Sequence, residues 1–195
     1  ILTLHRARYP MLQLVSHEEA RVDRALGRLA SEESRALFKW RATTGLVGPD
    51  GPIEQTGGLQ EAIVAFSEIS TPAFLLLFDV AAWWEEPTLR RQLRDLSQSV
   101  GPKQQIVMLL GCDARVPNDL EKEVTVIDIP LPDREAVGVL LAALLKAQKL
   151  EVPTGLFWRF VDGCLGLTER EIKRLLARIM MIGSGFSEED LKVLV

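Results

Sequence analysis

The feature of this sequence that most constrains its fold is an unbroken apolar run from Phe74 to Phe78, which ends at Asp79. Successive side chains of a strand point to opposite faces of a sheet, so a wholly apolar strand fits a sheet covered on both faces. Segments 11–15, 37–41, 106–110 and 124–129 are also typical of strands, and segments with helical spacing separate most of them. This alternation predicts an α/β fold, a three-layer parallel sheet with right-handed crossovers and helices on both faces.

Local signals predict where the helices between these strands begin. Ser16 and Glu19 have capping-box spacing ahead of an apolar stripe, which predicts a helix opened by Ser16. Apolar residues recur at helical spacing over 59–66, and Thr88 is typical of the cap of a further helix. Segment 48–58 is rich in glycine and proline, so we expect a mobile loop there.

The pattern changes after Pro132 to helices alone, which are expected over 134–149, 154–162 and 168–181. Thr168 and Glu171 form a second capping-box pattern, and Ser187, preceded by Phe186, is expected to start a fourth helix. We therefore expect an α/β domain over 1–132 and a small all-helical, lid-like subdomain over 133–195. The chain lacks an initial methionine and ends just after a helix start, so we expect it to be a fragment of a longer protein.

Composition excludes several classes of protein. The net charge of −4 argues against a dedicated nucleic-acid binder, which needs clustered lysine and arginine. The two cysteines, Cys112 and Cys164, lie far apart without a CxxC pattern, so neither a disulfide framework nor a zinc site is indicated. The apolar runs are shorter than the roughly 18 residues that a membrane span needs. We expect a soluble, cytoplasmic protein with reduced thiols and no membrane contact.

The chemistry of a parallel sheet is expected at the carboxyl ends of its strands. A phosphate-binding loop needs glycines to wrap the phosphates, a lysine for charge and a serine or threonine for the metal. After the first strand the chain instead has Ser16, His17, Glu18 and Glu19, and no Gly-Lys pair occurs anywhere in the sequence. The sequence therefore predicts that this chain does not hydrolyse ATP on its own and holds no cofactor or metal.

Asp79 stands at the end of a buried strand, where a metal-binding aspartate is expected, but Val80 follows it in place of a water-activating glutamate. Asp79 then either caps the next turn as a vestige of such a site or still contacts an ion or a partner. The adjacent Trp83 and Trp84 either cover the end of the core or anchor a partner in an interface.

Three arginines, Arg90, Arg91 and Arg94, give the following helix a basic edge. With Glu86 and Asp95 nearby, this edge is typical of a solvated face rich in ion pairs. The alternative is a surface that contacts nucleic acid or another partner.

Three stretches together resemble an AAA+ ATPase module. Segment 74–79 resembles the Walker B strand, 111–117 the sensor-1 turn, and 127–133 the strand that leads into the lid. With segments 6–10, 43–46 and 120–123, nearly the whole chain is similar to the N-terminal region of the plastid and cyanobacterial hypothetical-reading-frame AAA ATPases and their bacterial relatives.

This resemblance implies that a catalytic AAA+ module, which would use ATP and Mg²⁺, follows Val195. The present region departs from a working ATPase in four places. Walker A is absent after Val15, Val80 and Ala114 replace catalytic and sensor residues, and acidic residues at 121 and 123 replace the arginine-finger region. Phosphoryl transfer depends on positioning and charge stabilisation, and each lost part contributed to both.

The resemblance therefore favours a degenerate AAA+ module that serves as a scaffold, regulatory or assembly domain. Its expected partners are the AAA+ module of the same chain and further copies in a homo-oligomer. One alternative is a clamp-loader-like, nucleic-acid-associated adaptor that uses Arg90, Arg91 and Arg94. Another is an enzyme with an acidic, metal-binding site built from Glu18, Glu19 and Asp79.

Overall fold

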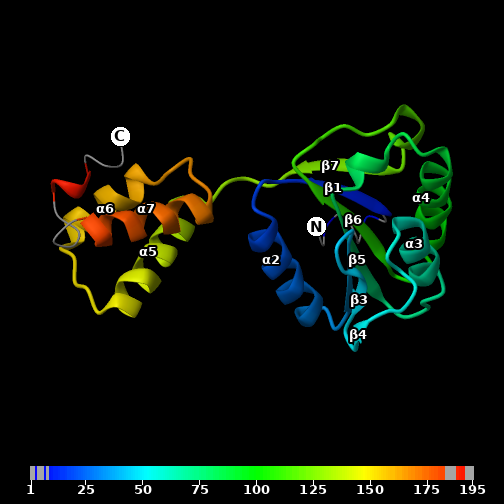
Figure 1. Ribbon diagram of the computed structural model, residues 1–195, viewed down its shortest axis with the longest axis horizontal. Helices are drawn as coiled ribbons and strands as arrows, with labels where there is room; N and C mark the ends of the chain where they lie inside the picture. The colour runs from blue at the N-terminus through cyan, green and yellow to red at the C-terminus, as the bar shows by residue number, and fades with distance from the viewer. Residues whose placement is uncertain (1–2, 4–6, 8, 183–187, 192–195) are drawn as a thin grey trace. The chain divides into compact units, whose positions relative to one another are not determined.

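The computed structural model describes residues 3, 7, 9–182 and 188–191. Within it the chain forms two compact units, Ile1–Ile129 and Pro130–Val195 (Figure 1). Two expected features fall wholly or partly outside the described residues: the start of a fourth helix at Phe186 and Ser187, and segment 6–10. No helix in the described ranges has both the length and the apolar character needed to cross a membrane.

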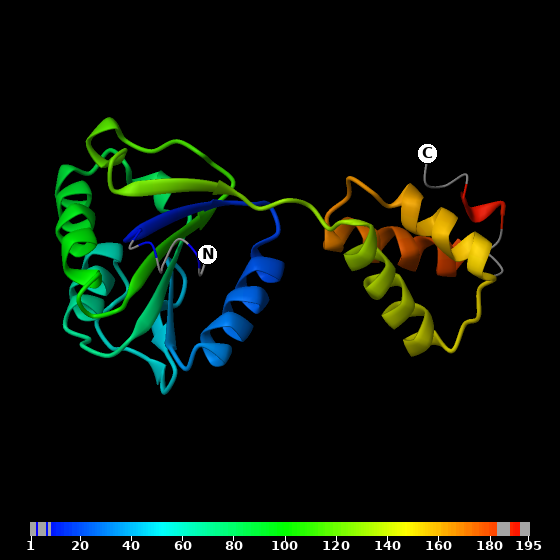
Figure 2. The same cartoon turned by 180° about the vertical axis from the view of Figure 1, so that it is seen from behind.

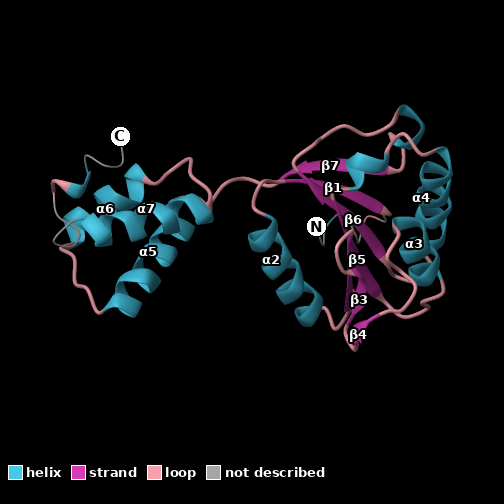
Figure 3. Ribbon diagram, in the orientation of Figure 1, coloured by secondary structure: helices cyan, strands magenta, loops and turns pink. Residues whose placement is uncertain are grey.

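The first unit is built on a sheet of seven described strands in the order β4-β3-β2-β5-β6-β1-β7 (Figure 3). Strands β2, β5, β6, β1 and β7 run parallel to their neighbours in this order, which confirms the predicted α/β class. Their bounds are β1 Met11–Val15, β2 Ala36–Arg41, β3 Gly45–Gly48, β4 Gly51–Pro52, β5 Ala73–Phe78, β6 Ile106–Gly111 and β7 Val124–Asp128.

Helices cover both faces of this sheet, as predicted. Helix α2 (Glu19–Glu32) packs on one face, and α3 (Leu59–Ser67) and α4 (Pro87–Val100) pack on the other (Figures 1 and 2). Strand β5 divides its side chains between them: Phe74, Leu76 and Phe78 join the core beneath α2, and Leu75 and Leu77 join the core beneath α3 and α4. All five are at most 3% exposed, which explains why this strand has no polar residue.

The turn-rich segment after β2 corrects the prediction of a purely parallel sheet followed by a loop. Strand β3 turns back and pairs antiparallel with β2, and β4 pairs antiparallel with β3. The chain can reverse because Gly45 has a φ of 69°, in the left-handed region that glycine tolerates. Gly48 is also required by packing, since a Cβ there would lie 2.8 Å from the ring of Phe38.

Thr56 fastens this antiparallel ribbon to the sheet. Its hydroxyl accepts a hydrogen bond from the Leu46 N–H at 3.0 Å and donates to the Ile53 carbonyl at 2.6 Å. Its carbonyl accepts from the indole N–H of Trp40 at 3.2 Å. Thr56 is 3% exposed, so these buried polar groups depend on one another rather than on water.

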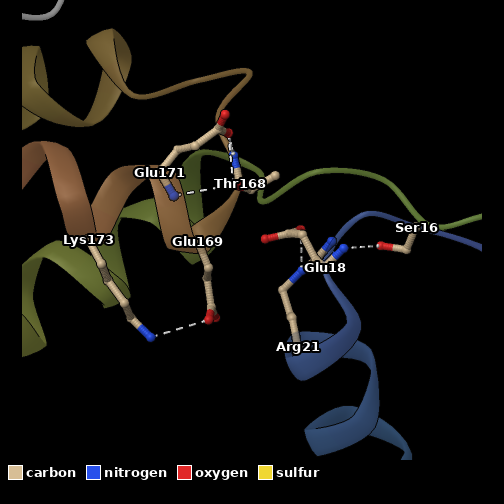
Figure 4. Close-up of polar contacts among 7 residues, drawn as sticks. All are labelled: Ser16, Glu18, Arg21, Thr168, Glu169, Glu171 and Lys173. Atoms are coloured by element: carbon tan, nitrogen blue, oxygen red, sulfur yellow. Dashed lines mark hydrogen bonds and ion pairs between the residues drawn. The ribbon is translucent and has the colours of Figure 1, made fainter. Parts of the chain in front are cut away.

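The second unit consists of helices α5 (Arg134–Gln148), α6 (Thr154–Gly163) and α7 (Glu169–Ile182), close to the ranges predicted. Its core includes Val137, Leu141, Phe160, Ile172 and Leu176, which are each at most 1% exposed. The predicted capping box is confirmed, and Figure 4 shows it.

In this capping box the Glu171 N–H donates to the Thr168 hydroxyl at 3.2 Å, and the Thr168 N–H donates to the Glu171 carboxylate at 2.8 Å. Lys173 and Glu169 add an ion pair of 3.4 Å one turn apart on the same helix. Near the C-terminus, Leu191 packs against the core of this unit.

Replacing Thr56 by valine tests the role of the anchor. Thr56→Val keeps the shape but leaves the Leu46 N–H and the Ile53 carbonyl without the hydroxyl, so we expect a loss of about 2 kcal/mol in unfolding free energy. Urea unfolding followed by tryptophan fluorescence measures it. The control Thr71→Val changes an exposed threonine, and its effect should stay within about 0.5 kcal/mol. Equal losses of unfolding free energy in the two variants would contradict the role of Thr56 as the anchor of the β3–β4 ribbon.

Candidate functional site

The carboxyl edge of the sheet brings together the residues that follow β1, β5 and β6. The Ser16 N–H donates to the Gly111 carbonyl at 2.9 Å, and the Asp79 N–H donates to the Leu110 carbonyl at 2.8 Å. Ser16, Asp79 and Cys112 therefore leave the sheet at one edge, where ligands bind in open α/β folds.

The connection from β1 to α2 is very short. Strand β1 ends at Val15 and α2 begins at Glu19, so only residues 16–18 lie between them. A phosphate-binding loop places an eight-residue pattern, G-x-x-x-x-G-K-[ST], between strand and helix. The connection here is shorter than that pattern and contains no glycine.

The start of α2 differs from the prediction. The predicted capping box of Ser16 and Glu19 is wrong, because the helix begins at Glu19 with Glu18 as its N-cap residue. The Ser16 hydroxyl instead accepts the Glu18 N–H at 3.0 Å, which closes the turn ahead of the helix (Figure 4). The reason is spacing, because an N-cap residue directly precedes the first helical residue, whereas Ser16 lies three residues before Glu19.

Glu18 places a buried carboxylate at this helix start. Its side chain is 4% exposed, and its Oε2 lies 2.6 Å from the Nε of Arg21 (Figure 4). Negative charge at a helix N-terminus is favoured by the helix dipole, which is also what makes such a terminus attractive to phosphate. The carboxylate of Glu18 thus lies at the positive end of the α2 dipole.

Other acidic residues of α2 are bound to β2. The Nε of Arg41 lies 3.2 Å from Glu19, and its Nη2 lies 3.3 Å from Asp23. Lys39 pairs with Asp23 at 2.7 Å, and the guanidinium of Arg41 stacks 3.7 Å from the centre of the Phe78 ring. This network ties the first turns of α2 to the sheet.

Asp79 makes the turn that leaves β5. Its φ of 56° and ψ of 30° are left-handed, and its carbonyl accepts the Ala82 N–H at 3.1 Å at the start of the 3-10 helix η1 (Val80–Trp83). The residue is exposed, and among the described contacts its backbone, not its carboxylate, supports η1. In the described ranges no three or more His, Cys, Asp or Glu residues form a group that could hold a metal ion, so Glu18, Glu19 and Asp79 do not.

The two tryptophans lie against the protein's own core. Trp84 is 7% exposed and its indole N–H donates to the Arg115 carbonyl at 3.0 Å. Trp83 is half-buried and meets Trp40 edge to face, with ring centroids 5.4 Å apart. Trp84 is therefore covered by its own chain and does not present its ring to a partner.

The three arginines of α4 are each paired with a carboxylate. Arg90 lies 3.3 Å from Asp119, and Arg94 lies 3.4 Å from Glu123. Arg91 pairs with Asp95 one turn along the same helix. The arrangement is that of an ion-paired face.

A small cavity beside this edge is bordered by Arg90 and by three charged residues that the sequence did not single out as candidate contacts. It has a volume of about 470 Å³ and is bordered by Glu85, Arg90, Arg115 and Asp119. Arg115 also donates to Asp113 at 2.8 Å, and this guanidinium lowers the pKa of the Asp113 carboxyl. Sequence reasoning placed Asp113 and Arg115 in a turn, but nothing in the local pattern indicated their pairing.

Comparison with known proteins gives one consistent result. Residues 1–129 match the family described as "SpoVK-like AAA ATPase, N-terminal domain". Among similar curated proteins, an uncharacterised AAA domain-containing protein, ycf46, from Trieres chinensis is 23% identical over 201 residues, covering 100% of this chain and 40% of the relative. Its counterpart from Guillardia theta is 24% identical over 194 residues, covering 96% and 38%. The chain thus spans 38 to 40% of the length of these relatives.

Solved structures show the same fold. The AAA domain of FIGL-1 in complex with ADP superposes with a TM-score of 0.63 at 13% identity, covering 96% of this chain and 71% of that one. C. elegans PCH-2 gives a TM-score of 0.63 at 9% identity, covering 100% and 61%. Identities this low show the fold alone, and they confirm the AAA+-like architecture predicted from the sequence.

The two cysteines should differ sharply in reactivity. Burial raises the pKa of the Cys164 thiol, and Cys164 is 1% exposed, whereas Cys112 at the carboxyl edge is exposed. Because the thiolate is the reactive form, a disulfide reagent at pH 8 should modify Cys112 promptly and Cys164 only on unfolding. Counting labelled thiols by mass spectrometry before and after urea measures this. Rapid labelling of both thiols in the folded chain would contradict this difference in reactivity. In the control variant Cys112→Ser, the rapid labelling should disappear.

Proposed function

Because the chain belongs to the SpoVK-like AAA ATPase N-terminal domain family, we propose that it is a non-catalytic AAA+-like module that serves assembly or regulation of a larger AAA protein. The observation that carries the proposal is the three-residue connection between β1 and α2, with the buried carboxylate of Glu18 at the start of the helix. An AAA fold without a phosphate loop keeps surfaces for packing but loses the means of holding a nucleotide.

Charge and geometry act together against nucleotide at this edge. Phosphoryl transfer needs backbone N–H groups, a lysine and a metal ligand around the phosphates. Here the first helical turn is occupied by Glu18 and Arg21, and Glu19 is held by Arg41. A triphosphate at this position would meet a carboxylate in a poorly solvated setting, where like charges repel most strongly.

ATP use in this proposal belongs to another module. The relatives are about two and a half times as long as the part this chain matches, since coverage is 38 to 40% of their length. We assign ATP and Mg²⁺ to a catalytic AAA+ module in that additional length, and we assign to the present module contacts with it and with further copies.

The alternative function, a nucleic-acid-associated adaptor, receives less support. Phosphate contacts require cations that are available to the backbone of the nucleic acid. Arg90, Arg91 and Arg94 each have a carboxylate partner, so binding would have to break these pairs first.

Calorimetric titration of the purified chain with ATP and Mg²⁺ tests the proposal that the module is non-catalytic and holds no nucleotide. We expect no saturable heat up to about 1 mM nucleotide, the range of the weakest useful affinities. Glu18→Gln should behave in the same way, because removing one charge restores neither the glycine loop nor its lysine. A working AAA ATPase domain is the positive control. Micromolar binding by this chain would overturn the proposal.

Deletion of the module tests its proposed role in assembly or regulation. In a longer protein organised like the relatives, removing residues 1–195 should change the oligomeric state and lower the ATPase rate, because the catalytic module loses its packing partner. Light scattering and a phosphate-release assay measure the two. If both stayed as in the intact protein, the module would have no assembly or regulatory role.

A further inference from the structure

Helix α7 packs with α5 and α6 in the second unit and turns only one of its faces to their shared core (Figure 1). Ile172, Leu176 and Ile179 form the inward face and are each at most 1% exposed. The outward face has two neighbouring rows, because residues three and four apart are adjacent on a helix surface. All six residues of these rows are exposed: Arg170, Arg174 and Arg178 in the first, and Lys173, Ala177 and Met181 in the second.

The first of these rows, which we call the arginine row, is not neutralised by its own unit. Within residues 9–182 and 188–191, no carboxylate pairs with any of its three side chains. The two other arginines of this unit do have partners: Arg134 lies 2.6 Å from Asp162, and Arg159 pairs with Glu188. The arginine row therefore differs from the other arginines of the helical unit in its open charge.

The carboxylates closest to the row in sequence are held by other groups. Glu171 accepts from the Thr168 N–H at 2.8 Å in the capping box, and Glu169 lies 3.4 Å from the Nζ of Lys173 (Figure 4). In the second row this ion pair neutralises the lysine, and Met181 is 88% exposed. The outward face of α7 thus has three open cations beside a strip that is mainly apolar.

The arginine row does not stabilise α7 itself. Like charges four residues apart on a helix repel each other. Arg170 also places a cation in the first turn of the helix, where the helix dipole disfavours positive charge. An anion bound from outside relieves both effects, so the row favours an acidic ligand that lies along the helix.

We propose that the outward face of α7 binds an acidic helical segment of a partner protein. The arginines of the row follow one another at about 6 Å along the helix axis, because each residue of a helix rises about 1.5 Å. An acidic helix with carboxylates at i, i+4 and i+8 has the same spacing. Each guanidinium can then donate to one carboxylate with two parallel N–H groups. An apolar side chain next to these carboxylates would pack on Ala177 and on the flexible thioether of Met181.

A nucleic acid fits this face less well than a short acidic segment does. Its affinity for a protein grows with the number of phosphates that lysine and arginine neutralise, and three arginines neutralise few. A strand that continued past Arg170 would meet the carboxylates of Glu169 and Glu171 at the start of the helix. Its phosphates would also gain nothing from Met181. The inference goes beyond the proposed function, because it concerns the second unit and holds whether or not the first unit binds nucleotide.

A designed peptide is the probe for this face. It is a cross-linked helix of about 18 residues, long enough to stay helical, with glutamates at i, i+4 and i+8 and leucines next to them. A scrambled peptide of the same composition has no row of carboxylates. Fluorescence anisotropy of each labelled peptide is followed while the full chain is added at low salt. We expect a dissociation constant of about 100 μM or lower for the designed peptide, and binding about tenfold weaker for the scrambled one.

The substitution Arg174→Glu reverses the charge at the centre of the row. It should weaken binding of the designed peptide about tenfold or more, because like charges then face each other. The helix should tolerate it, since the introduced carboxylate lies one turn from both Arg170 and Arg178, and circular dichroism checks this. A peptide with lysine in place of the central glutamate should restore binding to this variant.

The matched control is Arg28→Glu, which makes the same change of charge on α2. Arg28 is exposed and likewise has no carboxylate partner in the part of the chain that the structure describes. Because a distant surface charge contributes little to binding, this control should change the affinity less than about twofold. A loss equal to that of Arg174→Glu would show that only net charge matters and would overturn the inference.

Other results would overturn it as well. These are the absence of saturable binding up to about 1 mM chain, and equal affinity for the designed and scrambled peptides. A single-stranded oligonucleotide or phosphatidylserine vesicles are tested in the same way. If either bound more tightly than the peptide and lost its binding with Arg174→Glu, the face would belong to a different class of partner and the inference would fail.

Discussion

Burial of β5 on both faces is the constraint on which the α/β unit depends. Phe74 and Leu76 face α2, while Leu75 and Leu77 face α3 and α4, and all four are fully buried. A strand this apolar is stable only when helices cover both sides, so the crossovers between parallel strands must supply them. This arrangement also sets the position of the carboxyl edge, because all the parallel strands end at the same edge of the sheet.

Much of this architecture could be predicted because it depends on local periodicity. The apolar runs, the helical stripes and the Thr168 capping box each act over a few residues, and the structure has all of them. The β3–β4 ribbon could not be predicted from its glycines and prolines, since it depends on Thr56, which is distant from Trp40 in sequence. The pairing of Glu19 and Asp23 with Arg41 was missed for the same reason, because it joins separate elements.

The candidate site shows how the residues at the carboxyl edge contribute to the structure of their own unit. Asp79 ends a buried strand, and its backbone makes the turn into η1. Trp84, next to that turn, is used as core and as a donor to the Arg115 carbonyl. The side chains of Trp84, Arg90 and Arg94, which the sequence pattern marks as candidate contacts, are here engaged by their own unit.

The length of the connection between β1 and α2 limits which changes could create a phosphate loop here. A side chain can be introduced by a single substitution, but residues 16–18 would need an insertion of about five residues to reach the eight-residue phosphate-loop pattern. Any such insertion would also displace Glu18 and the ion pairs that tie α2 to β2. The short turn and these ion pairs therefore fix the spacing between β1 and α2 together, so neither can change without the other.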